Sequence, residues 1–564
     1  MHDSKNLWLT IFLSALVMLA WQYFYAIPQH KVPVVNAVTG KTQGLADPAA
    51  ERSPGGAGKA MLKERDAAIT ESPRVLIDNG ELHGSINLKG ARFDDIELTK
   101  YKQTIEQGSP PVVLLSPADT ESFYFGEFGW LAKGNGQAPD SSAIWKADSN
   151  KLTPGKPLTL TWRNNSGVVF KQVITLDENY MFKVTQSVEN KSAAPLELKP
   201  YGLLNRTHKK AKTYYILHEG PLGVINGTLQ EITYQKLIDD KKIEYKDAKG
   251  WLGVTDKYWL TAIVPEGDNF DSHFIYSGKD NIDRFQVDYL GKPLAINPGE
   301  TKETSAYFFA GAKEVRLLDD YAKKLNITLF DRAIDFGWLY FLTKQLFYLL
   351  NFIHTHVGNF GVAIILLTLI VKLLLFPIAN KSYKSMSKMK TLQPEIMKLR
   401  ERFKDDKVKL NQGVMELYKR EKVNPLSGCL PLLIQIPIFL ALYKVFFVTI
   451  EMRQAPFFGW IHDLSAPDPT SIFNLFGLLH WNPPAFLMIG ILPLLYGITM
   501  FIQQSLNPAP ADPVQAQMMK ALPFLLVFMF ASFPAGLVLY WVCSNILSIA
   551  QQWVITRETR REKK

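Results

Sequence analysis

The chain has 564 residues, a formal net charge of +10 and 47% hydrophobic residues. Only two cysteines occur, Cys429 and Cys543, which excludes a disulfide-stapled scaffold. The average composition hides two unlike halves, because residues 26–335 are polar and mixed in charge whereas nearly all long apolar runs follow residue 336. A single soluble domain is therefore excluded, and the sequence predicts one soluble and one membrane-embedded part.

The first apolar run extends from Leu7 to Tyr25 and follows a short head that contains Lys5. A cleaved secretory signal has a shorter apolar core of about 7–15 residues followed by a small-residue cleavage site. This run is longer and ends in Trp21, Tyr23, Phe24 and Tyr25, which is typical of an interfacial aromatic belt. Residues 1–25 are therefore predicted to form an uncleaved signal-anchor span.

Two soluble segments follow the anchor. Residues 26–60 are rich in Pro, Gly and Ala and cannot bury enough apolar surface to order themselves, so they are predicted to be a flexible linker. Residues 61–330 contain many short alternating segments, such as KPLTLTWRNNSGVVFKQVITL, separated by Gly, Asn, Asp and Pro turns. This pattern predicts a large all-β domain of the sandwich class.

Residues 331–357 change to a helical pattern. The stretch from Phe336 to His356 is aromatic but contains Lys344, Gln345 and Asn351. We predict an amphipathic helix that lies in the membrane interface. A spanning helix is the alternative for this segment.

Residues 358–556 are predicted to form a core of five further spans, which makes six in total. Each apolar run approaches the ~20 residues that cross the hydrocarbon of a bilayer. The runs are Val362 to Ile378, Leu426 to Val448, Phe486 to Gln503, Met518 to Phe533 and Gly536 to Ile555.

The distribution of basic residues predicts the topology. The segment 380–424 between the first two core spans is strongly basic, and the positive-inside rule places it in the cytoplasm. With six spans both chain ends are then cytoplasmic and the β-domain lies outside, in the periplasm of a bacterium with an inner and an outer membrane. The basic C-terminal tail, residues 557–564, agrees with this and contains Arg557, Arg560, Arg561, Lys563 and Lys564.

The cytoplasmic segment also has apolar residues at helical spacing on both sides of a charged break at Asp405, Asp406 and Lys407, which predicts a helical hairpin. It is either a solvated pair of helices or a basic platform for lipid headgroups, ribosomal RNA or an acidic targeting factor. The sequence does not separate these alternatives. Its candidate binding residues are Lys384, Lys388, Lys390, Arg400 and Arg402.

Lys372 is the residue in the core that most needs an explanation. It lies inside the apolar run Val362 to Ile378, where a cation costs about 2.5–3.5 kcal/mol on insertion scales. Its helix runs from outside to inside, and helical side chains lean toward the helix N-terminus, so snorkelling to the cytoplasmic surface works against the backbone. The later spans have no Asp or Glu in their interiors. We therefore expect a water-filled cavity that is open to one side.

Other polar residues in the spans are candidates for the same cavity. Thr368 lies one turn before Lys372, and later spans contain Gln435, Ser544, Asn545 and Ser548. Polar residues in spanning helices more often form hydrogen bonds between helices than sites, so each of them alone is weak evidence.

Three longer stretches resemble signature segments of the YidC family of membrane protein insertases. They are KVNPLSGCLPLLIQIPIFLALYK from Lys422 to Lys444, RQAPFFGWIHDLSAPDP from Arg453 to Pro469, and FPAGLVLYWVCSN from Phe533 to Asn545. The layout of anchor, large outer domain, interfacial helix and five-span core resembles the same family over the whole chain.

The resemblance implies a β-supersandwich in the periplasm and a hydrophilic groove in the membrane that opens to the cytoplasm. Lys372 occupies the position of a functionally important positive residue that is usually arginine in the family. The other expected groove residues are Thr368, Pro431, Gln435, Tyr540, Trp541 and Ser544. Lysine keeps the charge there but lacks the planar fork of a guanidinium.

The resemblance also implies the function and the partners. The chain is expected to insert nascent integral membrane proteins into the bacterial inner membrane and to help them fold, alone or with the Sec translocon. Expected contacts are membrane lipids and, through the basic hairpin and tail, the ribosome and the signal recognition particle pathway. No enzymatic activity, cofactor, metal or DNA is expected.

Two other classes of function are alternatives to membrane protein insertion. A solute transporter or channel would also use an intramembrane lysine, but the chain shows no pair of matching Gly/Pro-broken segments in two halves. A periplasmic enzyme tethered to the membrane would need a catalytic motif. The soluble half offers only scattered histidines, namely His83, His208, His218 and His273.

Overall fold

The computed structural model describes residues 63–132, 138–208, 217–279, 282–403, 406–424, 430–479, 481, 483–484, 487–507 and 513–561. The described residues up to Asp335 form one compact unit, and those from Phe336 onward form another. The predicted anchor 1–25 and linker 26–60 lie outside the described residues.

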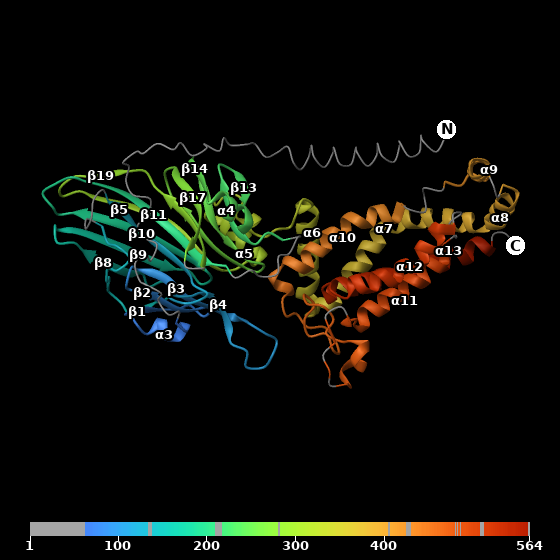
Figure 1. Cartoon of the computed structure of the whole chain (residues 1–564), viewed down its shortest axis with the longest axis horizontal. Coiled ribbons are helices and arrows are strands. Elements are labelled where there is room, and N and C mark those ends of the chain that lie inside the picture. The colour runs from blue at the N-terminus through green and yellow to red at the C-terminus, as the bar shows by residue number, and fades with distance from the viewer. Residues whose placement is uncertain are drawn as a thin grey trace. The chain divides into compact units, whose positions relative to one another are not determined.

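The first unit contains two β-sheets, which Figure 1 shows mainly in blue and green. The larger sheet has the order β14-β17-β18-β11-β5-β3-β2-β1-β7, with β19 paired to β11 and β4 paired to β3. Its strands are β1 (Arg74–Asp78), β2 (Leu82–Asn87), β3 (Arg92–Lys102), β4 (Pro111–Leu115), β5 (Tyr124–Ala132), β7 (Lys151–Leu152), β11 (Leu196–Thr207), β14 (Lys242–Ala248), β17 (Phe270–Lys279), β18 (Ile282–Leu290) and β19 (Leu294–Ile296).

The second sheet has the order β13-β12-β15-β16-β20-β10-β9-β8-β6. Its strands are β6 (Lys146–Ala147), β8 (Leu158–Arg163), β9 (Val168–Leu176), β10 (Met181–Asn190), β12 (Gly220–Ile225), β13 (Thr228–Glu231), β15 (Gly250–Thr255), β16 (Trp259–Pro265) and β20 (Thr301–Ala312). Side chains along β10 alternate between buried and half-buried, as the sequence pattern predicts for a strand with one face on a core.

Aromatic side chains join the two sheets face to face. The ring of Phe93 on β3 lies 5.3 Å from the ring of Phe182 on β10 and 5.0 Å from that of Phe308 on β20. Phe128 on β5 adds a contact to Phe308 at 5.9 Å. The burial of these rings drives the sheets together. The predicted β-rich domain is confirmed.

Three helices complete this unit, namely α3 (Arg65–Ile69), α4 (Tyr234–Asp240) and α5 (Val315–Lys324). The segment after α5 is held to the sheets and not left as a free tether. It contains the short helix η2 (Phe330–Ala333), whose Phe330 packs against Trp251 at 5.3 Å. The indole Nε1 of Trp251 donates a hydrogen bond of 3.0 Å to the carbonyl of Thr328.

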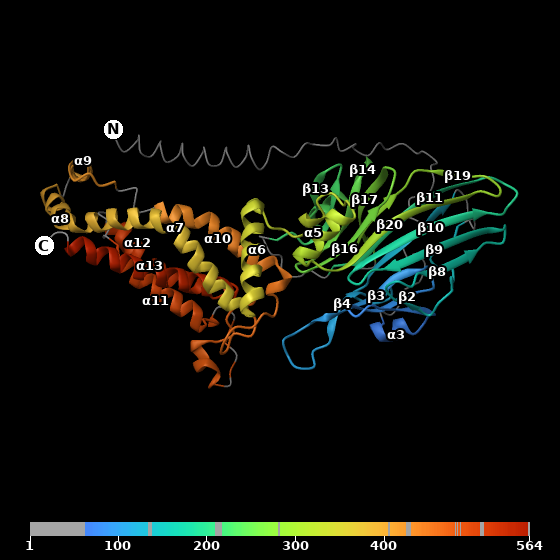
Figure 2. The same cartoon turned by 180° about the vertical axis from the view of Figure 1, so that it is seen from behind.

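The second unit is helical. Its helices are α6 (Tyr340–Val357), α7 (Phe360–Thr391), α8 (Gln393–Arg402), α9 (Lys407–Arg420), α10 (Leu430–Val448), α11 (Ile491–Leu506), α12 (Pro513–Phe530) and α13 (Ala535–Arg561), with the short helices η4 (Ile450–Met452) and η5 (Ile472–Gly477) between α10 and α11. Figures 1 and 2 both show α7 and α13 side by side, in yellow and red.

The apolar helices of this unit differ in length. Within the described part of the chain, α7 and the segment Ala535–Arg557 of α13 are long and apolar enough to cross a membrane. Shorter apolar stretches are Leu433–Val448, Ile491–Leu506 and Gln517–Phe530. Large apolar side chains stand exposed on these helices, including Leu374 at 73% and Phe524 at 67%, which water does not favour. The count of six spans remains a prediction.

Two predicted helix boundaries were wrong. The helix expected from Phe336 begins only at Tyr340, because Gly337 takes a positive φ of 72° and interrupts the backbone before it. The first limb of the basic hairpin is not a separate helix from about residue 380. Instead α7 continues through Pro377 to Thr391, and α8 follows after Leu392. A proline removes one backbone donor, but it does not force a helix to end when the surrounding helices support it.

Candidate functional site

The helix α7 carries Lys372 into the middle of the apolar bundle. Asn359 caps the start of this helix, because its side chain accepts a hydrogen bond from the backbone N–H of Val362 at 3.1 Å. Lys372 follows Phe360 by twelve residues, which places it about 18 Å along the helix axis. This distance is comparable with half of a hydrocarbon core about 30 Å thick.

Lys372 contacts α13 through a single hydrogen bond. Its Nζ donates to Ser548 Oγ at 2.9 Å. Among the described residues no carboxylate lies within ion-pair distance of this ammonium. An ammonium has three N–H donors, so a neutral hydroxyl leaves most of its capacity free. The contact places Ser548 beside Lys372.

Polar side chains follow α13 at intervals of four residues. Tyr540, Ser544, Ser548 and Gln552 are all buried, although the surrounding bundle is mostly apolar. Residues four apart share one side of a helix, so these four form a continuous strip. Together with Lys372 and Gln435 they make up what we call the polar seam.

The ends of the polar seam are tied to other helices. Gln435 of α10 donates its Nε2 to the hydroxyl of Tyr540 at 2.5 Å. At the other end, Gln552 Nε2 donates to Asn507 Oδ1, directly after α11, at 3.0 Å. Sequence reasoning named Gln435 and Tyr540 separately but missed Gln552 and Asn507. The four-residue repeat that starts at Tyr540 was the signal for Gln552.

The remaining predicted groove residues have other surroundings. Thr368 is buried, and its hydroxyl donates a hydrogen bond of 2.7 Å to the carbonyl of Ile364, one turn earlier in α7. Pro431 is half-buried at the start of α10, where a proline fits the first turn of a helix. Asn545 Nδ2 donates to Thr499 Oγ1 of α11 at 3.2 Å, which makes it an interhelical hydrogen bonder.

Trp541 belongs to an aromatic cluster at the beginning of α13. Its ring lies 5.3 Å from Phe439 of α10, 5.9 Å from Tyr496 of α11 and 6.0 Å from Phe530 of α12. Four helices therefore meet around one indole. Its Nε1 is buried and has no hydrogen-bond partner in the described structure. Sequence reasoning listed Trp541 but missed its three neighbours, because they come from separate helices.

The basic hairpin consists of the end of α7 with α8 and α9. Asp406 caps α9 by accepting a hydrogen bond from the N–H of Lys409 at 3.0 Å, and Arg420 pairs with Glu395 at 2.9 Å. A groove of about 700 Å³ lies between α8 and α9, and its basic lining residues are Lys398, Arg402, Lys409 and Arg420.

The other predicted basic residues are distributed over this region. Lys384, Lys388 and Arg400 are exposed. Lys390 differs, because its Nζ donates to the last carbonyls of α11, those of Ser505 and Leu506, at 3.2 and 3.3 Å. In the tail, Arg557 lies over the ring of Trp553 at 5.4 Å, and Arg560 and Arg561 continue α13. Lys563 and Lys564 lie outside the described residues.

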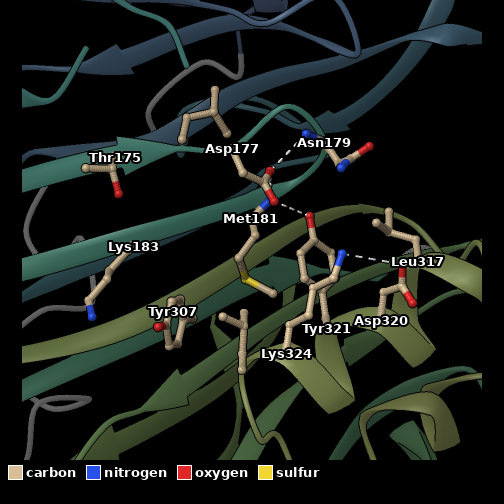
Figure 3. A pocket seen from close by; sticks show the side chains of 12 residues that line it. Thr175, Asp177, Asn179, Met181, Lys183, Tyr307, Leu317, Asp320, Tyr321 and Lys324 are labelled. Carbon is tan, nitrogen blue, oxygen red and sulfur yellow. Dashed lines mark hydrogen bonds and ion pairs between the residues drawn. The ribbon is translucent and has the colours of Figure 1, made fainter. Parts of the chain in front are cut away.

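The β-rich unit has its own cavity, of about 420 Å³, between β9, β10, β20 and α5 (Figure 3). Figure 3 shows the carboxylate of Asp177 accepting hydrogen bonds from the hydroxyl of Tyr321 and from the backbone N–H of Asn179. Asp177 Oδ1 also accepts from the N–H of Met181 at 3.0 Å. Lys183, on the rim, pairs with Glu266 at 2.8 Å. These partners indicate a structural role for both charges.

The histidines of this unit are also built into the fold. His208 stacks on Tyr234 at 3.9 Å, and burial lowers the pKa of His208. Burial opposes protonation of His273, but its 2.7 Å hydrogen bond with Asp288 outweighs this and raises the pKa of His273. In the described part of the chain, no three His, Cys, Asp or Glu side chains are grouped so that they could hold a metal ion.

Comparison with known proteins identifies the family. A family model described as "60Kd inner membrane protein" matches residues 352–563, and one described as "YidC periplasmic domain" matches residues 74–349. The membrane protein insertase YidC of Rickettsia bellii is 50% identical over 99% of both chains. The chain belongs to the YidC family of membrane protein insertases. The Rickettsia felis YidC is 48% identical over 98% of this chain and 99% of its own.

Solved structures superpose weakly. An active YidC insertase crystal structure with the first transmembrane domain resolved covers 86% of this chain and 95% of its own, with 18% identity and a TM-score of 0.37. A galactose mutarotase related enzyme from Lactobacillus acidophilus covers 42% of this chain and 97% of its own, with 11% identity and a TM-score of 0.30.

The YidC family places this protein in the bacterial inner membrane and among insertases, which act on nascent membrane proteins. The predicted family is therefore confirmed. The family is not one of catalytic enzymes, and nothing in the comparisons favours a transporter or channel.

Proposed function

We propose that this protein inserts nascent membrane proteins through the polar seam, with Lys372 as the residue that attracts their polar ends. The observation that carries this proposal is the hydrogen bond between Lys372 and Ser548, which joins α7 to a buried polar strip in an otherwise apolar bundle. A cation held there only by a hydroxyl can exchange that partner for a carboxylate at low cost.

The mechanism follows from the cost of moving polar groups across hydrocarbon. A short tail of the nascent chain enters the seam from the cytoplasm, where its acidic residues are attracted to Lys372 in surroundings of low dielectric constant. The apolar helix behind the tail then slides out along α7 and α13 into lipid. Burial of that helix in hydrocarbon drives release of the tail on the far side.

The proposal includes a topology of six spans with both chain ends in the cytoplasm. Residues 1–25 are the anchor, 26–60 the linker, and 61–330 a β-supersandwich in the periplasm. Residues 331–335 complete the β-rich unit and 336–357 lie in the interface; 358–556 form the five-span core with the hairpin 380–424, and 557–564 form the tail. The basic hairpin supports the cytoplasmic assignment of its loop.

The basic hairpin and tail are proposed to contact the translation machinery and lipid. The groove between α8 and α9 is lined by four basic residues, Lys398, Arg402, Lys409 and Arg420, against two acidic ones, Glu395 and Glu416. This balance suits an anionic partner such as ribosomal RNA, the signal recognition particle pathway or lipid headgroups. Insertion then proceeds alone or beside the Sec translocon. The protein has no enzymatic activity in this proposal.

The test is insertion of a substrate with an acidic translocated tail into proteoliposomes. Lys372→Ala and Lys372→Glu should impair translocation of the tail, and Lys372→Arg should support it, because the tail needs a cation in the seam. Lys520→Ala is the matched control, since Lys520 is an exposed lysine on α12, a helix that contributes no residue to the polar seam. Normal insertion by both charge-removing variants refutes the role of Lys372.

The path is tested by cross-linking. Cysteines placed at positions 368 and 541 in turn, which leave Lys372 in place, should label a stalled nascent chain, if the chain passes between α7 and α13. Equal labelling of a cysteine on the β-rich unit, such as one at Ile105, would show that the reaction reports collisions and not a path.

A further inference from the structure

The connection between α10 and α11 exposes an unusual amount of apolar surface. Leu478 is 78% exposed, Phe458 64%, and Leu475 and Phe476 are each 52% exposed. We call the exposed set the apolar wedge, and it consists of Phe458, Trp460, Phe473, Leu475, Phe476, Leu478, Leu479 and Trp481. Soluble surfaces rarely expose this many large apolar side chains in one connection unless something covers them.

The β-rich unit gives the internal comparison. Over its described residues, which number far more, the exposed large apolar side chains are Leu76, Ile105 and Ile144. The wedge therefore does not reflect a general tendency of this chain to expose such groups. The part of the wedge from Phe473 to Trp481 also lies in a stretch without charge, because no Asp, Glu, Lys or Arg occurs between Asp468 and Asp512.

Hydrogen bonds hold the wedge in its exposed position. Asp468 Oδ2 accepts from the N–H of Leu492 at 2.9 Å, which ties the loop to the start of α11. Ser471 Oγ donates to the carbonyl of Leu487 at 3.0 Å, and Trp481 Nε1 donates to the carbonyl of Phe473 at 3.0 Å. The apolar side chains thus stand on a braced loop.

The braced loop lies at the end of the helical unit where α7 and α13 begin. The N–H groups of Ala535 and Gly536 donate to the carbonyls of Ala466 and Leu464 at 2.7 and 2.9 Å. From this end, the outer faces of the long helices continue as apolar surface, with Leu374 73% exposed. The wedge is therefore apolar like the helix surface that the family places in the membrane.

We propose that the apolar wedge inserts into the headgroup and upper acyl region of the bilayer leaflet at this end and anchors the helical unit there. Trp460 and Trp481 have the amphipathic rings that favour this depth. A protein partner is a poorer fit, because protein interfaces carry a polar rim that would need charged or hydrogen-bonding groups opposite it. A braced apolar surface with few charges in its segment matches lipid instead.

The test is the accessibility of a spin label in proteoliposomes of phosphatidylethanolamine and phosphatidylglycerol. The label is placed by Leu478→Cys or Leu479→Cys in full-length protein with Cys429→Ser and Cys543→Ser. Controls are Leu374→Cys on the lipid-facing side of α7 and Ile105→Cys in the hairpin of β3 and β4. Oxygen concentrates in lipid, whereas a nickel chelate stays in water.

Labels on the wedge should collide with oxygen several-fold more, and with nickel several-fold less, than the label at position 105, and should approach the label at position 374. Nickel access equal to that at position 105 overturns the proposal, because the wedge would then face water. Low access to both reagents also overturns it, since protein would cover the wedge. The test contains no insertion step, so its outcome leaves the proposed insertase mechanism untouched.

Discussion

Ser548→Asp is the sharpest perturbation of the polar seam, because it gives Lys372 a permanent acidic partner. In the native chain the Lys372 Nζ has only the Ser548 hydroxyl, at 2.9 Å. An aspartate at the same position places a carboxylate beside the ammonium without a change in any other helix. If substrate insertion depends on an available cation, the internal carboxylate competes with the acidic tail and insertion fails.

The magnitude follows from Coulomb's law. Two opposite unit charges about 4 Å apart attract by about 4 kcal/mol at an effective dielectric constant of about 20. Every 1.4 kcal/mol corresponds to about a tenfold change in an equilibrium constant. Even half of this attraction would reduce occupancy of the seam by the substrate acid by more than about tenfold.

The assay is protease protection of a translocated tail in proteoliposomes, with Ser548→Asn as the uncharged control of similar size. Ser548→Asp should lose insertion of an acidic tail and keep insertion of a neutral tail. Loss of both substrates points to misfolding. Equal insertion of the acidic tail by the Asp and Asn variants refutes the competition and, with it, the role of an available cation.

Three further predictions concern stability. Gly250→Ala should lower the free energy of unfolding by about 2 kcal/mol or more, because a Cβ at φ +138° would lie 1.9 Å from the Val224 carbonyl oxygen. The control is Gly80→Ala, at φ +90° in open space, which should lower the free energy of unfolding by only about 1 kcal/mol. Thermal melts of both variants measure the difference. Burial lowers the pKa of Lys313 to about 8 from 10.5, so the folded state loses this proton first and stability should rise between about pH 8 and 10.5. Lys313→Met should remove that rise and be the more stable form at pH 7, which denaturant titrations at several pH values measure. Lys390→Ala should loosen the end of α11 by about 0.5–1 kcal/mol, seen as faster hydrogen exchange there, because a cation no longer binds its terminal carbonyls.

The sequence predicted the elements better than their partners. Apolar runs of about 20 residues identify helices directly, and the alternation along β10 identifies a strand. The boundaries predicted at Phe336 and near residue 380 were wrong, because they depend on the backbone of Gly337 and of Pro377 and on the surroundings of each. A glycine is compatible with a helix until the chain needs its positive φ.

Partners across the bundle could not be predicted for a different reason. Nothing local in the chain says which side of α13 faces α7, so Lys372 and Ser548 were both noticed without being paired. The aromatic cluster around Trp541 was missed because its members come from four helices. Contacts of this kind depend on tertiary packing and not on a local period.

The order of residues along α13 gives the polar seam a direction. Tyr540 and Trp541 lie near its start, where aromatic rings from α10, α11 and α12 surround the indole. Ser548 with Lys372 lies about 12 Å further along and Gln552 about 6 Å beyond that, at the usual rise of a helix. An acidic tail that approached from the aromatic end would have to cross a packed apolar cluster before it met the cation. From the Gln552 end it meets amide and hydroxyl groups first, and we therefore infer that polar chains reach Lys372 from that end.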